Sequence, residues 1–454
     1  MPLSSVNPAN GSVLHVFETW DRPRIDKALS QAARIVPEWR EIPLDQRAGL
    51  VRQAAHVLRH RRDHFAVMMT QEMGKLVTES RAEVDRCALV CDYYADHAAE
   101  FLADEPMAAG ELDARVVFQP LGTILGVMPW NFPFWQVFRF AAPALMAGNT
   151  VLLKHASNVP RCALAIEEVF RDAGFPAGAF QTLMITSDEV GRVIEDRRVH
   201  GVTLTGSEAA GRAVAAVAGG VLKPCVLELG GSDPFVVLED ADLDRAVEQA
   251  VVSRYRNAGQ SCIAAKRFIL VPQVVDGFLS RLKDAVAAIR PGDPMKEDSG
   301  IAPMARTDLR DELHQQVRDS IAEGAIPVMG CEPLPGKGAW YAPSILDRVV
   351  PGTRAYDEEI FGPVACILRA EDEDDALRLA NDTRFGLGGS VWTRDVARGE
   401  AFARGLACGS AFVNAMVKSD PRLPFGGIKD SGFGRELARP GIRTFMNAKT
   451  LVIR

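Results

Sequence analysis

A cysteine that follows a short glycine-containing turn is the first residue to suggest chemistry. Residues 255–262 read YRNAGQSC, so Cys262 comes three positions after Gly259. Such a turn can expose a thiol and surround it with backbone N–H groups, which is the setting of a nucleophile. The alternative is a buried structural cysteine, since a free cysteine often packs as a small apolar side chain. We take Cys262 as the candidate nucleophile.

A second candidate is a carboxylate in apolar surroundings. Glu228 stands between Leu227 and Leu229 at the end of an apolar run, directly before Gly230 and Gly231. Desolvation there would raise the pKa of the carboxyl toward that of a general base. A helix-capping or salt-bridged glutamate is the alternative that this segment by itself leaves open.

Both segments resemble the two signature motifs of the aldehyde dehydrogenase superfamily. Further matching motifs occur in the same order: MPWNFP at 128–133, Gly206-Ser207, EEIFGP at 358–363 and PFGGIKDSG at 424–432. The resemblance covers the whole chain. It implies an enzyme that oxidises an aldehyde to a carboxylic acid and passes hydride to a nicotinamide cofactor.

The resemblance also implies a role for each catalytic residue. Cys262 would attack the aldehyde carbon, and the side-chain amide of Asn131 and the backbone N–H of Cys262 would stabilise the oxyanion. One such donor is worth about 3–4 kcal/mol. Glu228 would activate the water that hydrolyses the thioester. Capping of the following helix is the alternative role of Asn131.

The resemblance places the cofactor at a strand-turn-helix segment. In residues 203–211, Gly206 and Ser207 join a predicted strand to a helix whose terminal N–H groups can receive a pyrophosphate. The segment lacks the GxGxxG pattern, so its assignment depends on the family. The other cofactor contacts that the family implies are Trp130, Leu229, Glu359 for the nicotinamide-side ribose and Phe361 beside the nicotinamide. Packing and salt bridges are their alternative roles.

Two residues bear on the choice between NAD and NADP. NAD-preferring relatives often carry a glutamate at the position of Ser157, where it accepts from the adenosine 2′-hydroxyl and repels a 2′-phosphate. Ser157 removes that repulsion, and Lys154 stays available to pair with a 2′-phosphate. We therefore expect NADP to be favoured over NAD.

Two arginines suggest a carboxylated substrate. Arg139 lies in a largely apolar stretch, where an unpaired guanidinium would be costly, and Arg256 comes six residues before Cys262. Both match arginines with which succinate-semialdehyde dehydrogenases grip the distal carboxylate, and Ser419 matches a serine with the same task. Asp420 would repel that carboxylate. Internal salt bridges are the alternative for each arginine.

The chain looks most like a shorter bacterial branch of these succinate-semialdehyde enzymes. Glutarate semialdehyde is the alternative substrate, because one methylene changes discrimination by only about 1–3 kcal/mol. Some of these enzymes carry a second cysteine two residues after the nucleophile as a redox switch. That position is Ala264 here, so we expect no such disulfide.

The same residues are compatible with other functional classes. Cys262 and Glu228 could serve a cofactor-independent thioesterase or esterase, which a cofactor requirement would distinguish. Acyl transfer to coenzyme A is disfavoured because Glu228 is present for hydrolysis. The intact nucleophile, base and oxyanion residues argue against a purely structural or binding role.

The elements that position these residues follow an α/β pattern, in which an apolar β-rich run leads through a glycine or polar cap into an alanine-rich helical stretch. The pattern predicts strands at 150–154 and 201–205, followed by helices at 161–173 and 208–218. These are βαβ units of a parallel sheet.

Flanking segments extend this organisation. Residues 45–72 and 77–102 predict long amphipathic helices, and residues 114–128 indicate a β-rich arm rather than core. A strand at 234–238 and a helix beginning at Leu243 open a second α/β series, within which residues 290–302 predict a loop.

The resemblance implies three structural parts: a Rossmann-type cofactor domain, an α/β catalytic domain and a small β oligomerisation arm. We assign the cofactor domain to 1–105 and 122–229, the catalytic domain to 230–430 and the arm to 106–121 and 431–454. The arm implies a homodimer or homotetramer.

Length, net charge and cysteine content restrict the domain number, the ligands and the location that the chain can have. A chain of 454 residues exceeds what one hydrophobic core usually supports. A net charge of −7 without a basic cluster disfavours nucleic acid as a ligand. We expect no secretion signal, no membrane span and a cytoplasmic location, since eight scattered cysteines suit a reducing compartment. Cys87 and Cys91 lack the further ligands of a metal site, so we expect no metal.

Overall fold

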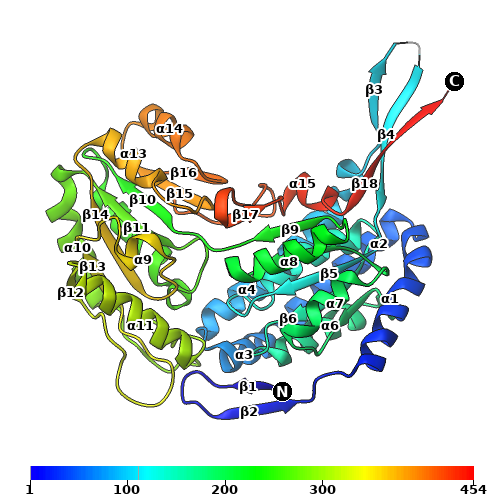
Figure 1. Cartoon of the computed structure of the whole chain (residues 1–454), viewed down its shortest axis with the longest axis horizontal. Coiled ribbons are helices and arrows are strands. Elements are labelled where there is room, and N and C mark those ends of the chain that lie inside the picture. The colour runs from blue at the N-terminus through cyan, green and yellow to red at the C-terminus, as the bar shows by residue number, and fades with distance from the viewer. Residues whose placement is uncertain (1, 111, 454) are drawn as a thin grey trace.

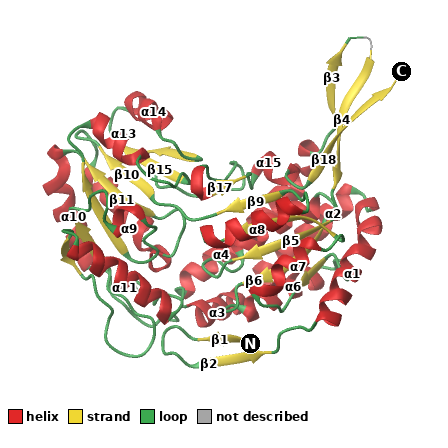
Figure 2. Cartoon of the chain, in the orientation of Figure 1, coloured by secondary structure: helices red, strands yellow, loops and turns green. Residues whose placement is uncertain are grey.

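The computed structural model describes residues 2–110 and 112–453. Two sheet-centred regions lie side by side, and a slender β arm projects from one of them (Figures 1 and 2). Each large sheet is mainly parallel, which confirms the predicted α/β class.

The first region is built on a six-stranded sheet in the order β17-β9-β8-β5-β6-β7. Its strands are β5 (Thr123–Met128), β6 (Thr150–His155), β7 (Phe180–Thr182), β8 (Val199–Thr205), β9 (Cys225–Glu228) and β17 (Gly432–Phe433). All pairs are parallel except β17 with β9. β6 is buried along its whole length, as expected of a central parallel strand with both faces covered.

Helices cover this sheet. They are α1 (Arg22–Glu41), α2 (Leu44–His60), α3 (Arg62–Met73), α4 (Val77–Phe101), α5 (Trp135–Met146), α6 (Pro160–Asp172), α7 (Val190–Glu195), α8 (Glu208–Gly220), α15 (Ala438–Arg443) and the 3₁₀ turn η1 (Ser187–Glu189). Every residue of α5 is buried, and this helix packs against α4 in the main core. α4 and α5 thereby bring Arg86 and Arg139 to one place.

The second region is built on a seven-stranded sheet in the order β12-β13-β14-β11-β10-β15-β16. Its strands are β10 (Asp233–Val237), β11 (Ala265–Leu270), β12 (Ile326–Met329), β13 (Ser344–Asp347), β14 (Val364–Arg369), β15 (Gly388–Trp392) and β16 (Ser410–Val413). Its helices are α9 (Leu243–Tyr255), α10 (Val275–Ala287), α11 (Thr307–Ala322), α12 (Arg354–Asp357), α13 (Glu373–Asn381) and α14 (Val396–Gly405). Short 3₁₀ turns complete it: η2 (Arg256–Gly259), η3 (Pro272–Val274) and η4 (Lys429–Ser431).

Two small sheets remain. β1 (Leu3–Val6) and β2 (Val13–Phe17) form an N-terminal hairpin. β3 (Glu105–Ala109), β4 (Leu112–Pro120) and β18 (Met446–Ile453) form the projecting antiparallel arm, in which β4 pairs with both other strands (Figure 1). The arm thus joins segments that are more than three hundred residues apart in the chain.

Most predicted elements lie where expected, and three differ. The helix expected over 45–72 is two helices, α2 and α3, because Arg61 leaves helical geometry with φ −102° and ψ 17°. No glycine or proline marks that break. The segment 114–128, whose β-rich sequence indicated an arm, divides at Gly122, the residue after the arm assigned to 106–121, into β4 of the arm and β5 of the buried sheet.

The third difference concerns the C-terminal segment that was assigned to the arm, residues 431–454. Its two-residue strand β17 pairs with β9 in the six-stranded sheet, and only β18 reaches the arm. A strand of two residues is too short to show the alternation of apolar and polar residues by which a strand is recognised in a sequence. Across the described ranges, no helix combines the length and apolarity that a bilayer crossing requires.

Candidate functional site

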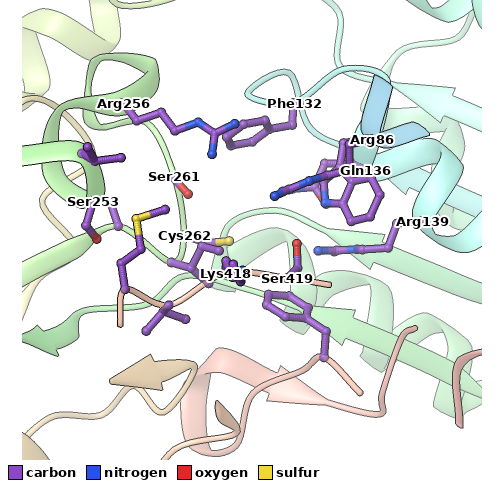
Figure 3. Close-up of a pocket in the computed structure, with 17 residues that line it drawn as sticks. Arg86, Phe132, Gln136, Arg139, Ser253, Arg256, Ser261, Cys262, Lys418 and Ser419 are labelled. Atoms are coloured by element: carbon purple, nitrogen blue, oxygen red, sulfur yellow. The ribbon is translucent and has the colours of Figure 1, made fainter. Parts of the chain in front are cut away.

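Two cavities meet at Cys262, which lines both of them. The first holds about 600 Å³, its open mouth included, and its wall includes Arg86, Arg139, Arg256 and Ser419 (Figure 3). The second holds about 960 Å³ measured in the same way, and Asn131 lies on its wall. A molecule in either cavity can therefore reach the sulfur atom.

A strained turn presents the candidate nucleophile. Asn257, Ala258 and Gly259 are consecutive residues in left-handed conformation, with φ values of 53°, 51° and 73°. Such a conformation costs a non-glycine residue about 1–3 kcal/mol and persists only where the surroundings enforce it. The turn follows helix α9 and places Cys262 at the junction of the two cavities.

Side-chain hydrogen bonds hold this turn against the segment that carries Asn131. Asn257 donates through Nδ2 to the carbonyl oxygen of Asn131 at 2.9 Å, and Asn131 donates through Nδ2 to the carbonyl oxygen of Gln260 at 3.1 Å. Gln260 accepts at Oε1 from the backbone N–H of Ala305. The sequence reasoning missed Asn257 and Gln260, although two amides that flank a glycine before a cysteine were a usable signal.

A buried lysine lies under the nucleophile. Lys266 donates from Nζ to the carbonyl oxygens of Ser261 at 2.9 Å and Cys262 at 2.7 Å, and it pairs with Glu359 at 3.1 Å. Burial raises the pKa of Cys262 to about 12, and the positive charge of Lys266 is the largest effect that opposes this rise. The thiol is therefore protonated at neutral pH and needs a base. Sequence reasoning did not identify Lys266.

Glu228, at the end of β9, is buried beside Arg139 and Glu436. Burial raises the pKa of Glu228 well above its usual value; Arg139 opposes the rise and Glu436 adds to it. Within the described ranges, neither carboxylate oxygen has a hydrogen-bond partner and Glu228 does not line the two cavities. The structure thus places this candidate base near the site but not on its wall.

Arg139 reaches the first cavity and is also engaged inside the protein. Its guanidinium forms an ion pair with Glu436, donates to Oγ1 of Thr205 at 3.2 Å and lies 4.8 Å from the ring centroid of Phe425. The internal salt bridge that was the alternative role of Arg139 is therefore present. Glu436 was not predicted from the sequence.

Arg256 and Ser419 lie on the same cavity wall as Arg139 (Figure 3). Arg256 forms no ion pair with any residue in the described part of the chain, although its charge opposes the rise that burial causes in the pKa of Glu79. Asp420 instead pairs with Arg422 at 2.7 Å, which lowers the pKa of Asp420 to about 2. Of these two neighbours, Ser419 is the one that lines the cavity.

The second cavity gathers six of the eight residues that the sequence assigned to a cofactor. These are Trp130, Gly206, Ser207, Leu229, Glu359 and Phe361. The rings of Trp130 and Phe361 meet edge to face at 5.8 Å between centroids. Ser207 caps α8 by accepting from the backbone N–H of Ala210 at 3.4 Å.

The shape and polarity of this cavity fit a dinucleotide. The N-terminus of α8 offers N–H groups to a pyrophosphate, and the aromatic pair can cover a flat ring near Cys262. Glu359, whose side chain is 18% exposed, accepts from the N–H of Gly231 at 3.1 Å and can accept from ribose hydroxyls. The absence of a side chain at Gly230 matters too, because a Cβ there would lie 2.5 Å from Oε2 of Glu359.

The two residues assigned to cofactor choice lie apart from this cavity. Ser157 is exposed and lines a separate hollow that also contains Arg306. Lys154 is nearly buried at the end of β6, and burial lowers its pKa while Asp188 opposes the change. The structure does not bring either of them onto the wall that holds Gly206.

Known proteins resemble the chain over its whole length. Residues 1–451 match the sequence profile of the aldehyde dehydrogenase family. The chain is 50% identical over 453 residues to the probable succinate-semialdehyde dehydrogenase, NADP(+), of Synechocystis sp., with 100% of both chains covered. It is 48% identical over 447 residues to the succinate semialdehyde dehydrogenase, NAD(P)+, Sad of Escherichia coli, with 98% of this chain and 97% of that one covered.

A solved structure shows the same fold. The crystal structure of succinic semialdehyde dehydrogenase from Streptococcus pyogenes, in complex with NADP+ as the cofactor, has a TM-score of 0.98 to this chain at 39% identity. The match covers 99% of both chains.

Proposed function

The chain belongs to the aldehyde dehydrogenase family, and we propose that it oxidises succinate semialdehyde to succinate with NADP as its favoured cofactor. It is an NAD(P)-dependent aldehyde dehydrogenase. The observation that carries the choice of substrate is the cavity beside Cys262, whose wall includes three arginines. Guanidinium groups bind carboxylates through paired hydrogen bonds, so this cavity suits an aldehyde with a carboxylate at its other end.

The proposed reaction begins with Cys262. Because burial keeps the free thiol protonated, its proton passes through water to the carboxylate of Glu228 as the sulfur attacks the aldehyde carbon. Glu228 releases this proton to solvent before it acts in hydrolysis. The resulting oxyanion lies between the amide of Asn131 and the backbone N–H of Cys262. The hydrogen bonds of Asn131 and Asn257 hold the segment of Asn131 against the turn that carries Cys262. The two donors are therefore in position before the oxyanion forms and need to move little during the reaction.

Glu228 is the proposed base for hydrolysis of the thioester. A carboxyl whose pKa is raised by burial accepts a proton from water more readily near neutral pH. Its side chain must turn from Arg139 toward the sulfur or act through a water molecule. Since its oxygens have no hydrogen-bond partner among the described residues, turning breaks no hydrogen bond.

The nicotinamide cofactor, when bound, supplies the hydride acceptor that turns the thiohemiacetal into the thioester. We propose that Gly206, Ser207 and the N-terminus of α8 hold its pyrophosphate and that Glu359 holds the nicotinamide-side ribose. Trp130, Leu229 and Phe361 form the apolar wall, and Lys154 and Ser157 face the adenosine side.

For the carboxylate we propose Arg256 and Ser419, with Arg139 contributing through the part of its guanidinium that Glu436 leaves free. Glutarate semialdehyde is the second candidate substrate, because the same cationic wall would bind its carboxylate. A cofactor-independent thioesterase is disfavoured by the second cavity, which opens on Cys262 and has no use in simple ester hydrolysis.

Initial-rate kinetics test the proposal. The substrates are succinate semialdehyde, glutarate semialdehyde and the uncharged butanal, each with NAD and with NADP, followed by the absorbance of the reduced cofactor. We expect kcat/KM at least tenfold higher for a carboxylated aldehyde than for butanal, and higher with NADP than with NAD. Preference for butanal would contradict the assignment of the arginines but not that of Cys262.

Assembly and compartment are also proposed. The arm exposes Met107, Val452 and Ile453 on strands that project from the body, so we infer that it pairs with a second copy in a homodimer or homotetramer (Figure 1). The eight cysteines are free in the structure. A reducing compartment such as the cytoplasm would keep them so.

A further inference from the structure

A third arginine faces the cavity beside Cys262. Arg86 lies on α4, an element that the sequence reasoning did not connect with the substrate. Its side chain enters the cavity from the opposite side to Arg256, and both guanidinium groups point toward the space above Cys262 (Figure 3). No ion pair or hydrogen bond links Arg86 to another side chain in the described ranges.

Arg86 is also oriented. Its guanidinium lies 5.1 Å from the ring centroid of Trp135, which is buried in α5. Stacking on an indole ring fixes the plane of a guanidinium and leaves its edge, which carries the N–H groups, free to donate. The edge is what a carboxylate requires for two parallel hydrogen bonds.

The charges around the cavity are unevenly compensated. Arg139 has a buried carboxylate partner in Glu436, whereas Arg86 and Arg256 have none among the described residues. Burial lowers the pKa of Arg86, and the positive charge of Arg256 lowers it further; Glu83 and Asp420 oppose this change, but neither forms an ion pair with Arg86. An anion bound between Arg86 and Arg256 would offset both the desolvation of Arg86 and the repulsion between the two guanidinium groups. An uncharged ligand would offset neither.

We propose that Arg86 is a specificity-determining residue that binds the distal carboxylate of the substrate together with Arg256, while Arg139 mainly holds Glu436. The inference rests on the proposed oxidation of a carboxylated aldehyde. It assigns Arg86 to ground-state binding, because the distal carboxylate does not change charge in the reaction. Loss of such an interaction raises KM and leaves kcat almost unchanged.

The test compares Arg86→Met with Arg81→Met. Arg81 lies on the same helix, but its guanidinium pairs with Asp63 and Glu297 at the surface. We expect Arg86→Met to raise KM for succinate semialdehyde about ten- to hundredfold, the value of a charged hydrogen bond, with little change for butanal. Arg81→Met should leave the KM values for both substrates near those of the wild type.

A binding measurement separates this inference from turnover. Succinate should protect Cys262 from iodoacetamide, and Arg86→Met should need at least tenfold more succinate for half-protection. Arg86→Lys keeps the charge without the planar fork and should lie between the wild type and Arg86→Met. If Arg86→Met does not fold, Arg86→Lys still allows the same measurement.

Two results are distinguishable. If the wild type prefers carboxylated aldehydes but both Arg86 variants keep its KM ratio and its protection by succinate, the role of Arg86 is refuted and the proposed function stands. If the wild type prefers butanal and succinate gives no protection, the proposed substrate class and the role of Arg86 fail together.

Discussion

The guanidinium of Arg139 forms an ion pair with the carboxylate of Glu436, and both side chains are buried. Glu228 lies in the same environment, where Arg139 lowers its pKa and Glu436 raises it. Arg139 therefore interacts with two carboxyl groups, and Arg435 makes a smaller contribution that also lowers the pKa of Glu228. The protonation of the proposed base depends on this balance, and the balance can be altered from either side.

Substitutions at Arg139 and Glu436 should move the pH profile in opposite directions. In Arg139→Met the charge that lowers the pKa of Glu228 is lost, so the rise of kcat with pH should shift to higher pH. In Glu436→Gln the neighbouring negative charge is lost, so the rise should shift to lower pH. Steady-state kinetics from pH 5 to 10 report both. Shifts in the same direction would contradict the proposed control of Glu228.

Gly426 should tolerate no side chain. A Cβ there would lie 2.7 Å from the carbonyl oxygen of Gly434 and 2.8 Å from Oε1 of Glu228. We expect Gly426→Ala to displace Glu228, to lower kcat at least tenfold and to destabilise the fold by about 1–3 kcal/mol. Gly219→Ala is the matched control, because nothing lies within 4 Å of its Cβ. Equal kcat in the two variants would show that Glu228 has room to move.

Lys266→Met should weaken two functions at once. Because the ammonium of Lys266 lowers the pKa of Cys262, its loss should slow alkylation by iodoacetamide at pH 9 severalfold. Glu359 would lose its ion pair, so the dissociation constant of NADP, measured by quenching of tryptophan fluorescence, should rise. The exposed Lys283 provides the control variant Lys283→Met. A fall in Tm without either change would mean that Lys266 is only structural.

Ser157→Glu should reverse the cofactor preference. A carboxylate at this exposed position would repel a 2′-phosphate and accept from a 2′-hydroxyl. We expect kcat/KM for NADP to fall at least tenfold while that for NAD is kept or raised. Ser157→Ala, which adds no charge, should change the ratio little. An unchanged ratio in Ser157→Glu would assign cofactor choice to other residues.

Sequence reasoning succeeded where the signal is local. The predicted strand at 150–154 and helix at 208–218 correspond to β6 and α8, since apolar periodicity and the Ser207 cap lie within the segment itself. The structure also brings Asn131 and Cys262 to adjoining cavity walls, and their catalytic roles stay predictions.

Contacts between side chains that are far apart in the sequence, or that depend on packing, could not be predicted. Arg139 and Glu436 are 297 positions apart, and their contact depends on how α5 packs against the segment after β17. Arg86 sits on one face of a 25-residue helix that carries several other charged residues, so nothing in its sequence neighbourhood marks it. The spacing of Lys266 after Cys262 likewise gives no sign that its ammonium folds back under the thiol.

The buried His155 makes the stability of the fold depend on pH. Burial lowers the pKa of His155 from 6.5 to about 4, and its ring hydrogen-bonds with the carbonyl oxygen of Pro133 at 2.9 Å and with the N–H of Ala156. Above pH 6.5 the ring is neutral in both the folded and the unfolded chain. As the pH falls toward 4, His155 binds a proton in the unfolded chain but stays largely neutral in the folded chain. The free energy of unfolding therefore falls by about 3 kcal/mol.

His155→Gln removes this proton linkage. Buried carboxyls with raised pKa values, such as Asp233 at about 6, change the stability in the opposite direction as the pH falls. The informative quantity is therefore the difference in the free energy of unfolding between the variant and the wild type. From urea unfolding at pH 7, 6, 5 and 4, that difference should move in favour of the variant by about 3 kcal/mol. His64→Gln, at an exposed position, should show no such trend. A constant difference across the series would mean that His155 is protonated as readily in the folded chain as in the unfolded one.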